Sequence, residues 1–279
     1  MIKKRILFYT ISIILTIWFG IALNLFSLNL GIDLKGGQLL EIKSNYKDLE
    51  NFLKNLNFRI DSVLKSGDRF IIKGENIDKD VLINEIKKVD PQATILSSEE
   101  ISPALSSELV KKSYLAVILV LIGISTYISI VFWDRKSLIP GYIFGIVVML
   151  TLAHDVISAM GIFITLSHYF GYILDTTIII ALLVIAGFSV HDTIVVLDRV
   201  RENLRKEGKI SEELFEKSIR QTLRRSINTS LTTILAVFPI LFMIPKLQAF
   251  VLTLIIGIII GTYSSICISS PLVYDIVKK

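Results

Sequence analysis

The chain has 279 residues, of which 52% are hydrophobic, and a mean hydropathy of +0.65. Soluble globular proteins are less apolar, so the composition indicates an integral membrane protein. The net charge is +5, but the basic residues gather at the ends of apolar runs, where they set orientation, and this excludes nucleic-acid binding. The single cysteine, Cys267, excludes an intrachain disulfide and a multi-cysteine metal site, and leaves the redox compartment open.

Three basic residues near the N-terminus, Lys3, Lys4 and Arg5, precede an apolar run over 6–28. A spanning helix needs about 20 apolar residues, so 1–28 is predicted to be an uncleaved first transmembrane helix with a cytoplasmic N-terminus. The alternative is a signal peptide cleaved after Ala22, and the apolar run disfavours it because it continues past that point.

The segment 29–112 has ordinary polarity and a nearly balanced charge, with 13 Lys and Arg against 14 Asp and Glu. Alternating and helical periodicities predict a β-α-β-β-α-β order, typical of a small ferredoxin-like α+β domain with two helices on one face of an antiparallel sheet. The predicted strands are 38–43, 58–64, 69–73 and 93–97, and the predicted helices are 46–56 and 77–89.

A glycine-rich stretch, GIDLKGG over 31–37, opens this domain. It lacks the spacing and the terminal Lys-Ser/Thr pair of a phosphate-binding loop, so nucleotide binding is not expected. Two interpretations stay open: a tight turn whose glycines supply positive φ, or a segment that faces a partner.

Five further apolar runs follow the domain, so six spanning helices are predicted in total, with 113–279 forming the bundle of the second to sixth. The pairs Gly141 with Gly145 and Gly257 with Gly261 permit close helix contacts. The five runs are 114–133, 138–166, 171–197, 227–244 and 249–277.

The connectors between these runs alternate in charge, which predicts orientation. The four predicted cytoplasmic segments, 1–5, 134–137, 198–226 and 278–279, carry 16 Lys and Arg, and the two short outer connectors carry only Lys246. Both termini are therefore predicted to be cytoplasmic and 29–112 extracytoplasmic.

The cytoplasmic loop 198–226 is predicted to contain a short amphipathic helix. Ser211 is its predicted N-cap, and its predicted apolar face consists of Leu214, Phe215, Ile219 and Leu223. This helix is expected to lie along the membrane surface.

Two spans carry the same charged dipeptide, His154-Asp155 in the third and His191-Asp192 in the fourth. A carboxylate in the hydrocarbon core costs ~2.5–3.5 kcal/mol on insertion scales, so Asp192 is a functional-site hypothesis. The alternative is that Asp192 lies close enough to the cytoplasmic end to reach water or cap a helix.

An enzyme is not expected. A metal hydrolase with a His-Asp dipeptide would need more ligands than the three histidines supply, and no catalytic nucleophile arrangement, metal site or cofactor fingerprint is found. The remaining hypothesis is proton or ion transport along a discontinuous series of charged residues across the bilayer: Asp175, Asp155, Asp192 and Arg225. His154 and His191 either titrate in this traffic or only bind neighbouring helices.

The stretch 187–203, GFSVHDTIVVLDRVREN, resembles the fourth-helix signature of SecF subunits in the SecD/SecF family of protein-export membrane proteins. Two positions depart from the family pattern, because His191 replaces the usual Asn and Leu34-Lys35 is closer to SecD. The short outer domain favours SecF. Four other stretches agree: Gly31 to Gly37, Ser102 to Leu109, His154-Asp155, and Arg225 to Ser230.

The resemblance implies an auxiliary subunit, driven by the proton motive force, of Sec-dependent protein translocation across the inner membrane, built on the six-helix half of the resistance-nodulation-division (RND) superfamily. It implies that Asp192 is the proton-linked carboxylate and Arg225 its partner. A proton-coupled exporter of small molecules or ions is the alternative, which a single small outer domain disfavours. The implied motif residues are Gly31, Asp33, Gly36, Gly37, Asp198 and Arg199, and the implied partners are a SecD-like subunit, a SecYEG-type translocon, a YajC-like accessory protein, the translocating polypeptide and membrane lipid.

Overall fold

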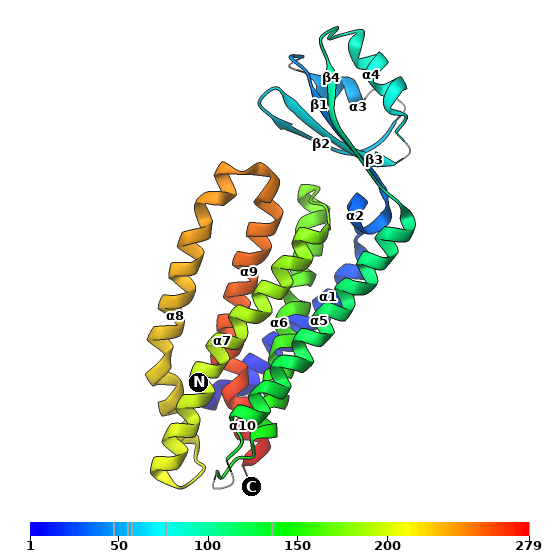
Figure 1. Cartoon of the computed structure of the whole chain (residues 1–279). Helices are drawn as coiled ribbons and strands as arrows, with labels where there is room; N and C mark the ends of the chain where they lie inside the picture. The colour runs from blue at the N-terminus through cyan, green and yellow to red at the C-terminus, as the bar shows by residue number, and fades with distance from the viewer. Residues whose placement is uncertain (47, 55, 57, 76, 135–136, 279) are drawn as a thin grey trace. The chain divides into compact units, whose positions relative to one another are not determined.

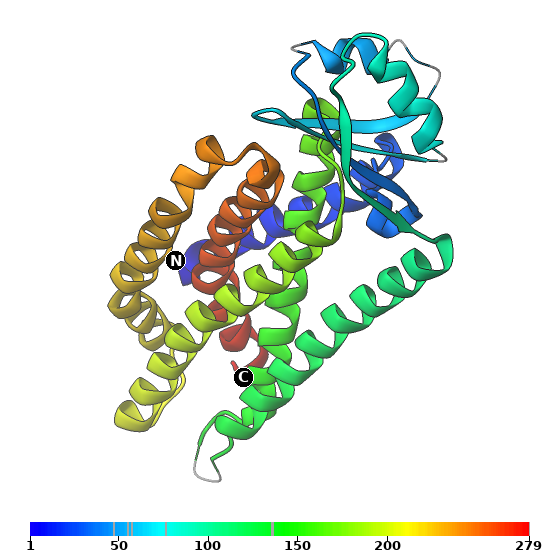
Figure 2. The ribbon, with the colours of Figure 1, turned by 45° about the horizontal axis from the view of Figure 1, so that its top comes forward.

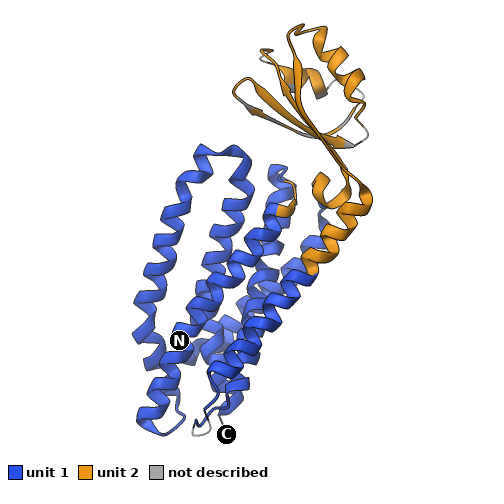
Figure 3. Cartoon of the chain, viewed as in Figure 1, with its two compact units in different colours: residues 1–28, 115–172, 177–279 blue, residues 29–114, 173–176 orange. Residues whose placement is uncertain are grey.

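The computed structural model describes residues 1–278 except 47, 55, 57, 76, 135 and 136 (Figure 1). Parts of the predicted helix 46–56 and of the basic connector 134–137 therefore lie outside the described residues. The chain forms two compact units (Figure 3). The helical unit contains 1–28, 115–172 and 177–279, and the sheet unit contains 29–114 and 173–176.

The described residues contain six helical segments that are long and apolar enough to span a membrane, which confirms the predicted number. The last segment is drawn as one continuous run of helix in Figures 1 and 2. Its middle stretch, η3, is π-helical. The long elements are α1 (Arg5–Leu25), α5 (Pro103–Val131), α6 (Gly141–Phe170), α7 (Thr176–Glu207), α8 (Glu212–Met243) and α9 (Gln248–Ser264), followed by η3 (Ser265–Ser269) and α10 (Ser270–Val277), and two short 3-10 turns are η1 (Ile2–Lys4) and η2 (Pro245–Leu247).

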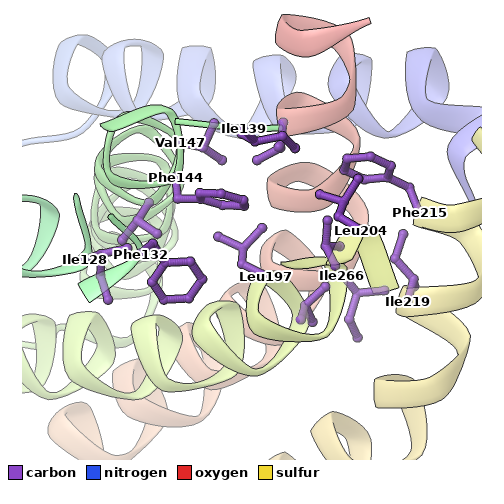
Figure 4. Packing of buried hydrophobic residues seen from close by; sticks show 14 of the residues in the cluster. Ile128, Phe132, Ile139, Phe144, Val147, Leu197, Leu204, Phe215, Ile219 and Ile266 are labelled. Atoms are coloured by element: carbon purple, nitrogen blue, oxygen red, sulfur yellow. The ribbon is translucent and has the colours of Figure 1, made fainter. Parts of the chain in front are cut away.

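One apolar core of the helical unit joins α5, α6, α7, α8 and η3. Figure 4 shows Phe132, Phe144 and Leu197 on one side of it and Phe215 and Ile219 on the other. A second cluster joins α6, α7 and α9 and includes the fully buried Ile185. These contacts fix α7, which carries Asp192, between its neighbours.

The expectation of a separate amphipathic helix on the membrane surface is wrong. Ser211 caps as predicted, since its Oγ accepts a hydrogen bond from the Leu214 amide at 3.2 Å, but the helix that begins there is α8, which continues unbroken to Met243. Phe215 and Ile219 are fully buried in the protein core (Figure 4). The helical period of apolar residues is the same whether they face lipid or protein, so the pattern could not distinguish the two.

The glycine pairs do mark close helix contacts. A Cβ on Gly257 would overlap the Ile185 side chain, and a Cβ on Gly261 would lie 3.0 Å from Ser189 Cβ, so both glycines bring α9 against α7. A Cβ on Gly145 would overlap Ser129 of α5. Small residues allow backbones in a membrane to approach in this way.

The sheet unit has four antiparallel strands in the order β2-β3-β1-β4. Its strands and two longer helices follow the predicted order, while the one-turn helix α2 inside the glycine-rich stretch was not predicted. The elements are α2 (Ile32–Lys35), β1 (Gly37–Lys43), α3 (Leu49–Lys54), β2 (Arg59–Ser66), β3 (Arg69–Glu75), α4 (Lys79–Lys87) and β4 (Thr94–Ile101).

Alternate residues of the central strands, Leu40 and Ile42 in β1 and Ile72 in β3, are buried against α3 and α4, as strand periodicity requires. Asp90 is a buried acid beside this core. Its carboxylate accepts hydrogen bonds from Ser44 Oγ at 2.7 Å, the Asn45 amide at 2.7 Å and the Gln92 amide at 3.1 Å. The Ser44 hydroxyl and these amides hold the pKa of Asp90 below its ordinary value.

Candidate functional site

Asp155 of α6 is fully buried, and groups from three helices converge on its carboxylate. Its Oδ2 accepts hydrogen bonds from the hydroxyls of Ser189 in α7 and Ser264 in α9, the latter at 2.7 Å. Its Oδ1 lies 2.9 Å from Nδ1 of His154. Both oxygens therefore have partners, and the carboxylate ties α6, α7 and α9 together.

Asp192 lies one helical turn beyond Ser189 on α7, so it lies on the same side of the helix. Its side chain is 3% exposed, and its Oδ2 has no hydrogen-bond partner within the described part of the chain. Its polar surroundings are Ser226 of α8, Ser265 of η3, His191 and Arg225. Asp192 is thus a buried acid with spare hydrogen-bonding capacity, unlike Asp155.

Arg225, the predicted partner of Asp192, is near enough to act on it electrostatically. The ion pairs of the described residues do not include one between them, and Arg225 is exposed on α8. His191 is also exposed, on the flank of α7 beside Asp192. The arrangement therefore places an exposed cation near a buried acid, and no ion pair joins the two within the described residues.

Buried serines line this region, and the sequence patterns did not single them out. Ser264 and Ser265 lie at the start of the π-helix η3, and Ser269 and Ser270 lie at its end. All four are fully buried. π-helical turns are rare and occur often at functional sites. These serines could have been found from the sequence, because they form two pairs that flank the short run 266–268 inside an apolar span.

A cavity of about 330 Å³ lies between α7 and α8. Arg199 donates a hydrogen bond from Nε to Gln221 Oε1 at 2.7 Å and pairs with Glu202 beside it. The predicted motif residues Asp198 and Arg199 thus meet Arg225 at one cavity. Its lining is Ile194, Val195, Asp198, Arg199, Glu202, Gln221, Thr222 and Arg225.

The remaining predicted residues belong to the sheet unit. Asp175 packs against Gly31, and Asp33 accepts a hydrogen bond from Thr176 Oγ1 at 3.3 Å. Gly36 and Gly37 have φ of 89° and 145°, which supports the interpretation of a glycine turn. A place for Asp175 in a proton path stays a prediction.

Comparison with known proteins identifies the family. The family "Protein export membrane protein SecD/SecF, C-terminal" matches residues 81–279. The chain is 35% identical to the protein translocase subunit SecF of Thermobaculum terrenum, covering 95% of this chain and 90% of that one. It is 31% identical to SecF of Anaerolinea thermophila, covering 96% and 91%.

Its fold is also similar to solved structures. The crystal structure of SecDF, a translocon-associated membrane protein from Thermus thermophilus, superposes with a TM-score of 0.79 at 30% identity and covers 98% of this chain. A second SecDF structure, in the super-membrane-facing form, gives a TM-score of 0.73. The chain spans 38% of either SecDF chain. This multi-pass membrane protein therefore belongs to the SecF subunits of the SecD/SecF family of protein-export membrane proteins.

Proposed function

We propose that the chain is a SecF-type subunit that uses the proton motive force to assist Sec-dependent protein translocation across the cytoplasmic membrane. Its relatives are named translocase subunits, and the similar SecDF of Thermus thermophilus is described as a translocon-associated membrane protein. A SecD-type subunit is the proposed partner, because the chain matches SecF subunits and is similar to solved SecDF structures. A SecYEG-type translocon, a YajC-like accessory protein, the translocating polypeptide and lipid complete the proposed surroundings.

The observation that carries the proton-linked part is the burial of Asp192 with one carboxylate oxygen free of hydrogen bonds within the described residues. A membrane potential supplies about 2.3 kcal/mol per elementary charge per 100 mV. One proton can therefore bias a two-state rearrangement by that order if Asp192 binds it more tightly in one state. A carboxylate oxygen without a hydrogen-bond partner, in an apolar setting, is suited to a proton affinity that differs between the two states.

Arg225 supplies the second state. An ionised Asp192 attracts the guanidinium, and a protonated one releases it. Arg225 is exposed and outside ion-pair distance of Asp192 among the described contacts, which corresponds to the released state. Alternation between the two arrangements moves α8, which carries Arg225, relative to α7.

Asp155 has a different proposed part. His154, Ser189 and Ser264 already occupy its oxygens, so it is suited to hold α6, α7 and α9 together and to feed the path only indirectly. The proposed orientation places both termini in the cytoplasm and the ferredoxin-like sheet unit outside, where its movement would act on the translocating chain. The basic connectors and the strand order β2-β3-β1-β4 support these two assignments.

The test is preprotein export in inverted membrane vesicles under an imposed proton gradient. Asp192→Asn and Arg225→Ala should accumulate normally and lose the gradient-dependent stage of export, while Asp155→Asn should lose less. The matched control is Glu213→Gln, which neutralises an exposed acid in the first turn of α8. Full gradient-dependent export by Asp192→Asn would reject the proposal.

A further inference from the structure

The glycine-rich segment 29–37 of the sheet unit is joined to the start of α7. The Gly31 amide donates a hydrogen bond to Leu174 O at 2.8 Å, and the Leu174 amide donates one to Asn29 O at 2.7 Å. Leu30 and Leu174 thereby form an isolated parallel β-bridge. A third contact runs from Thr176 Oγ1 to Asp33 Oδ2 at 3.3 Å, and Thr176 is the first residue of α7.

The absence of a side chain at Gly31 favours this close approach. Its φ of −71° and ψ of 161° are open to any residue, so the backbone conformation does not call for glycine. An added Cβ would lie 3.0 Å from Asp175 Cβ and 3.3 Å from Ile173 Cγ2. A Cβ at position 31 would therefore push Asp175 and Ile173 away by a few tenths of an ångström, and the further carbons of a larger side chain would crowd this contact more.

The same segment, 29–37, also contacts the start of α5 and strand β3. Ser106 Oγ of α5 donates a hydrogen bond to Ile32 O at 3.2 Å. A Cβ on Gly36 would lie 3.2 Å from Pro103 Cα, and one on Gly37 would lie 2.7 Å from Gly74 O in β3. One turn of helix, α2, thus meets the sheet and the first residues of two long helices.

We propose that 29–37, 103–106 and 173–176 form a rigid joint that transmits movement between the sheet and Asp192 along α7. The helix α7 is unbroken from Thr176 to Glu207, and Asp192 lies 16 residues from its start, about 24 Å at 1.5 Å per residue. The joint stays closed through the cycle. Gly31, Asp33 and Asp175 are positioning residues, and the inference rests on the proposed function because it names the part that couples proton passage to the sheet.

The first experiment separates coupling from proton passage. Gly31→Val, in complex with the SecD-type subunit, should accumulate and retain proton flux in proteoliposomes, but its gradient-dependent export should fall at least fivefold. Thr176→Val removes only the side-chain bond to Asp33 and should lose about twofold. Gly123→Val is the control, because a Cβ at that helical glycine of α5 meets nothing within 4 Å.

The second experiment restores the joint covalently. Leu30 and Leu174 are opposed in the bridge, at the strand spacing of about 4.8 Å that a disulfide can span. In a Cys267→Ala, Gly31→Val background, oxidised Leu30→Cys with Leu174→Cys should recover export, and a reductant should abolish the recovery. Leu30→Cys alone should not recover it.

Three results would overturn the joint: undiminished export by Gly31→Val, parallel loss of its proton flux, or no recovery on oxidation. A wild-type complex whose export ignores the gradient would instead reject the proposed function, so the two failures are distinguishable.

Discussion

Replacing Gly257 by Ala tests whether the close contact of α9 with α7 holds the acidic site together. The new Cβ would overlap Ile185 of α7, which is fully buried and must move. Overpacking of a filled core costs about 1–3 kcal/mol. Replacing a helical glycine by alanine gains about 1 kcal/mol of helix propensity, so the net loss of unfolding free energy is about 0–2 kcal/mol.

A double-mutant cycle isolates the steric part. Ile185→Ala removes all three side-chain atoms that the new Cβ would meet, so Gly257→Ala in that background should cost nothing, as Gly123→Ala should in the wild type. The expected coupling energy is about 1–3 kcal/mol, measured by reversible unfolding in mixed micelles. An equal cost of Gly257→Ala in both backgrounds would refute the packing argument.

Three further predictions concern other parts of the chain. Hydrogen bonds lower the pKa of Asp90 in the folded state. Its ionised side chain therefore stabilises the fold above the unfolded pKa of about 3.9, and this stabilisation is lost as the pH falls through the lower folded pKa. Asp90→Asn should weaken the acid dependence of hydrogen exchange at the β1 and α4 amides, and an unchanged pH profile would contradict this prediction. Ser264→Ala removes a hydrogen-bond donor from the buried Asp155 and should lower the unfolding free energy by about 1.5–3 kcal/mol. The Ser269 hydroxyl bonds only within its own helix among the described contacts, so Ser269→Ala should cost less than about 1 kcal/mol. Equal costs of the two variants would argue against a special role for Ser264. In a Cys267→Ala background, Lys79→Cys should react with an impermeant thiol reagent only from outside and Glu207→Cys only from inside, and labelling of both from one side would reject the topology.

The lengths of the apolar runs predicted the six spans, because the thickness of the hydrocarbon core fixes how many apolar residues a helix needs to cross it. It did not predict that α8 begins at Glu212, since charged residues such as Lys217 and Arg220 lie in the same unbroken helix as the apolar span. Hydropathy measures transfer into lipid, and helix continuity depends on backbone hydrogen bonds that charged residues also make.

The buried acids were predictable as candidates from their cost in a bilayer, but their different surroundings were not. Ser189 and Ser264 lie 75 residues apart and meet at Asp155 only because Gly261 brings α9 onto α7. The contact of Gly31 with Asp175 is likewise non-local. Local patterns report which residues need partners, and tertiary packing decides which partners they find.

Proton flux through the purified complex of this chain with its SecD-type subunit tests the central claim most directly. The complex is reconstituted in liposomes that contain a pH-sensitive dye, and a potassium diffusion potential drives proton entry. Wild-type and Glu213→Gln complexes should acidify the lumen, and Asp192→Asn should reduce the rate to that of protein-free liposomes. Wild-type flux through Asp192→Asn would contradict the assignment of Asp192 as the residue through which the proton gradient acts.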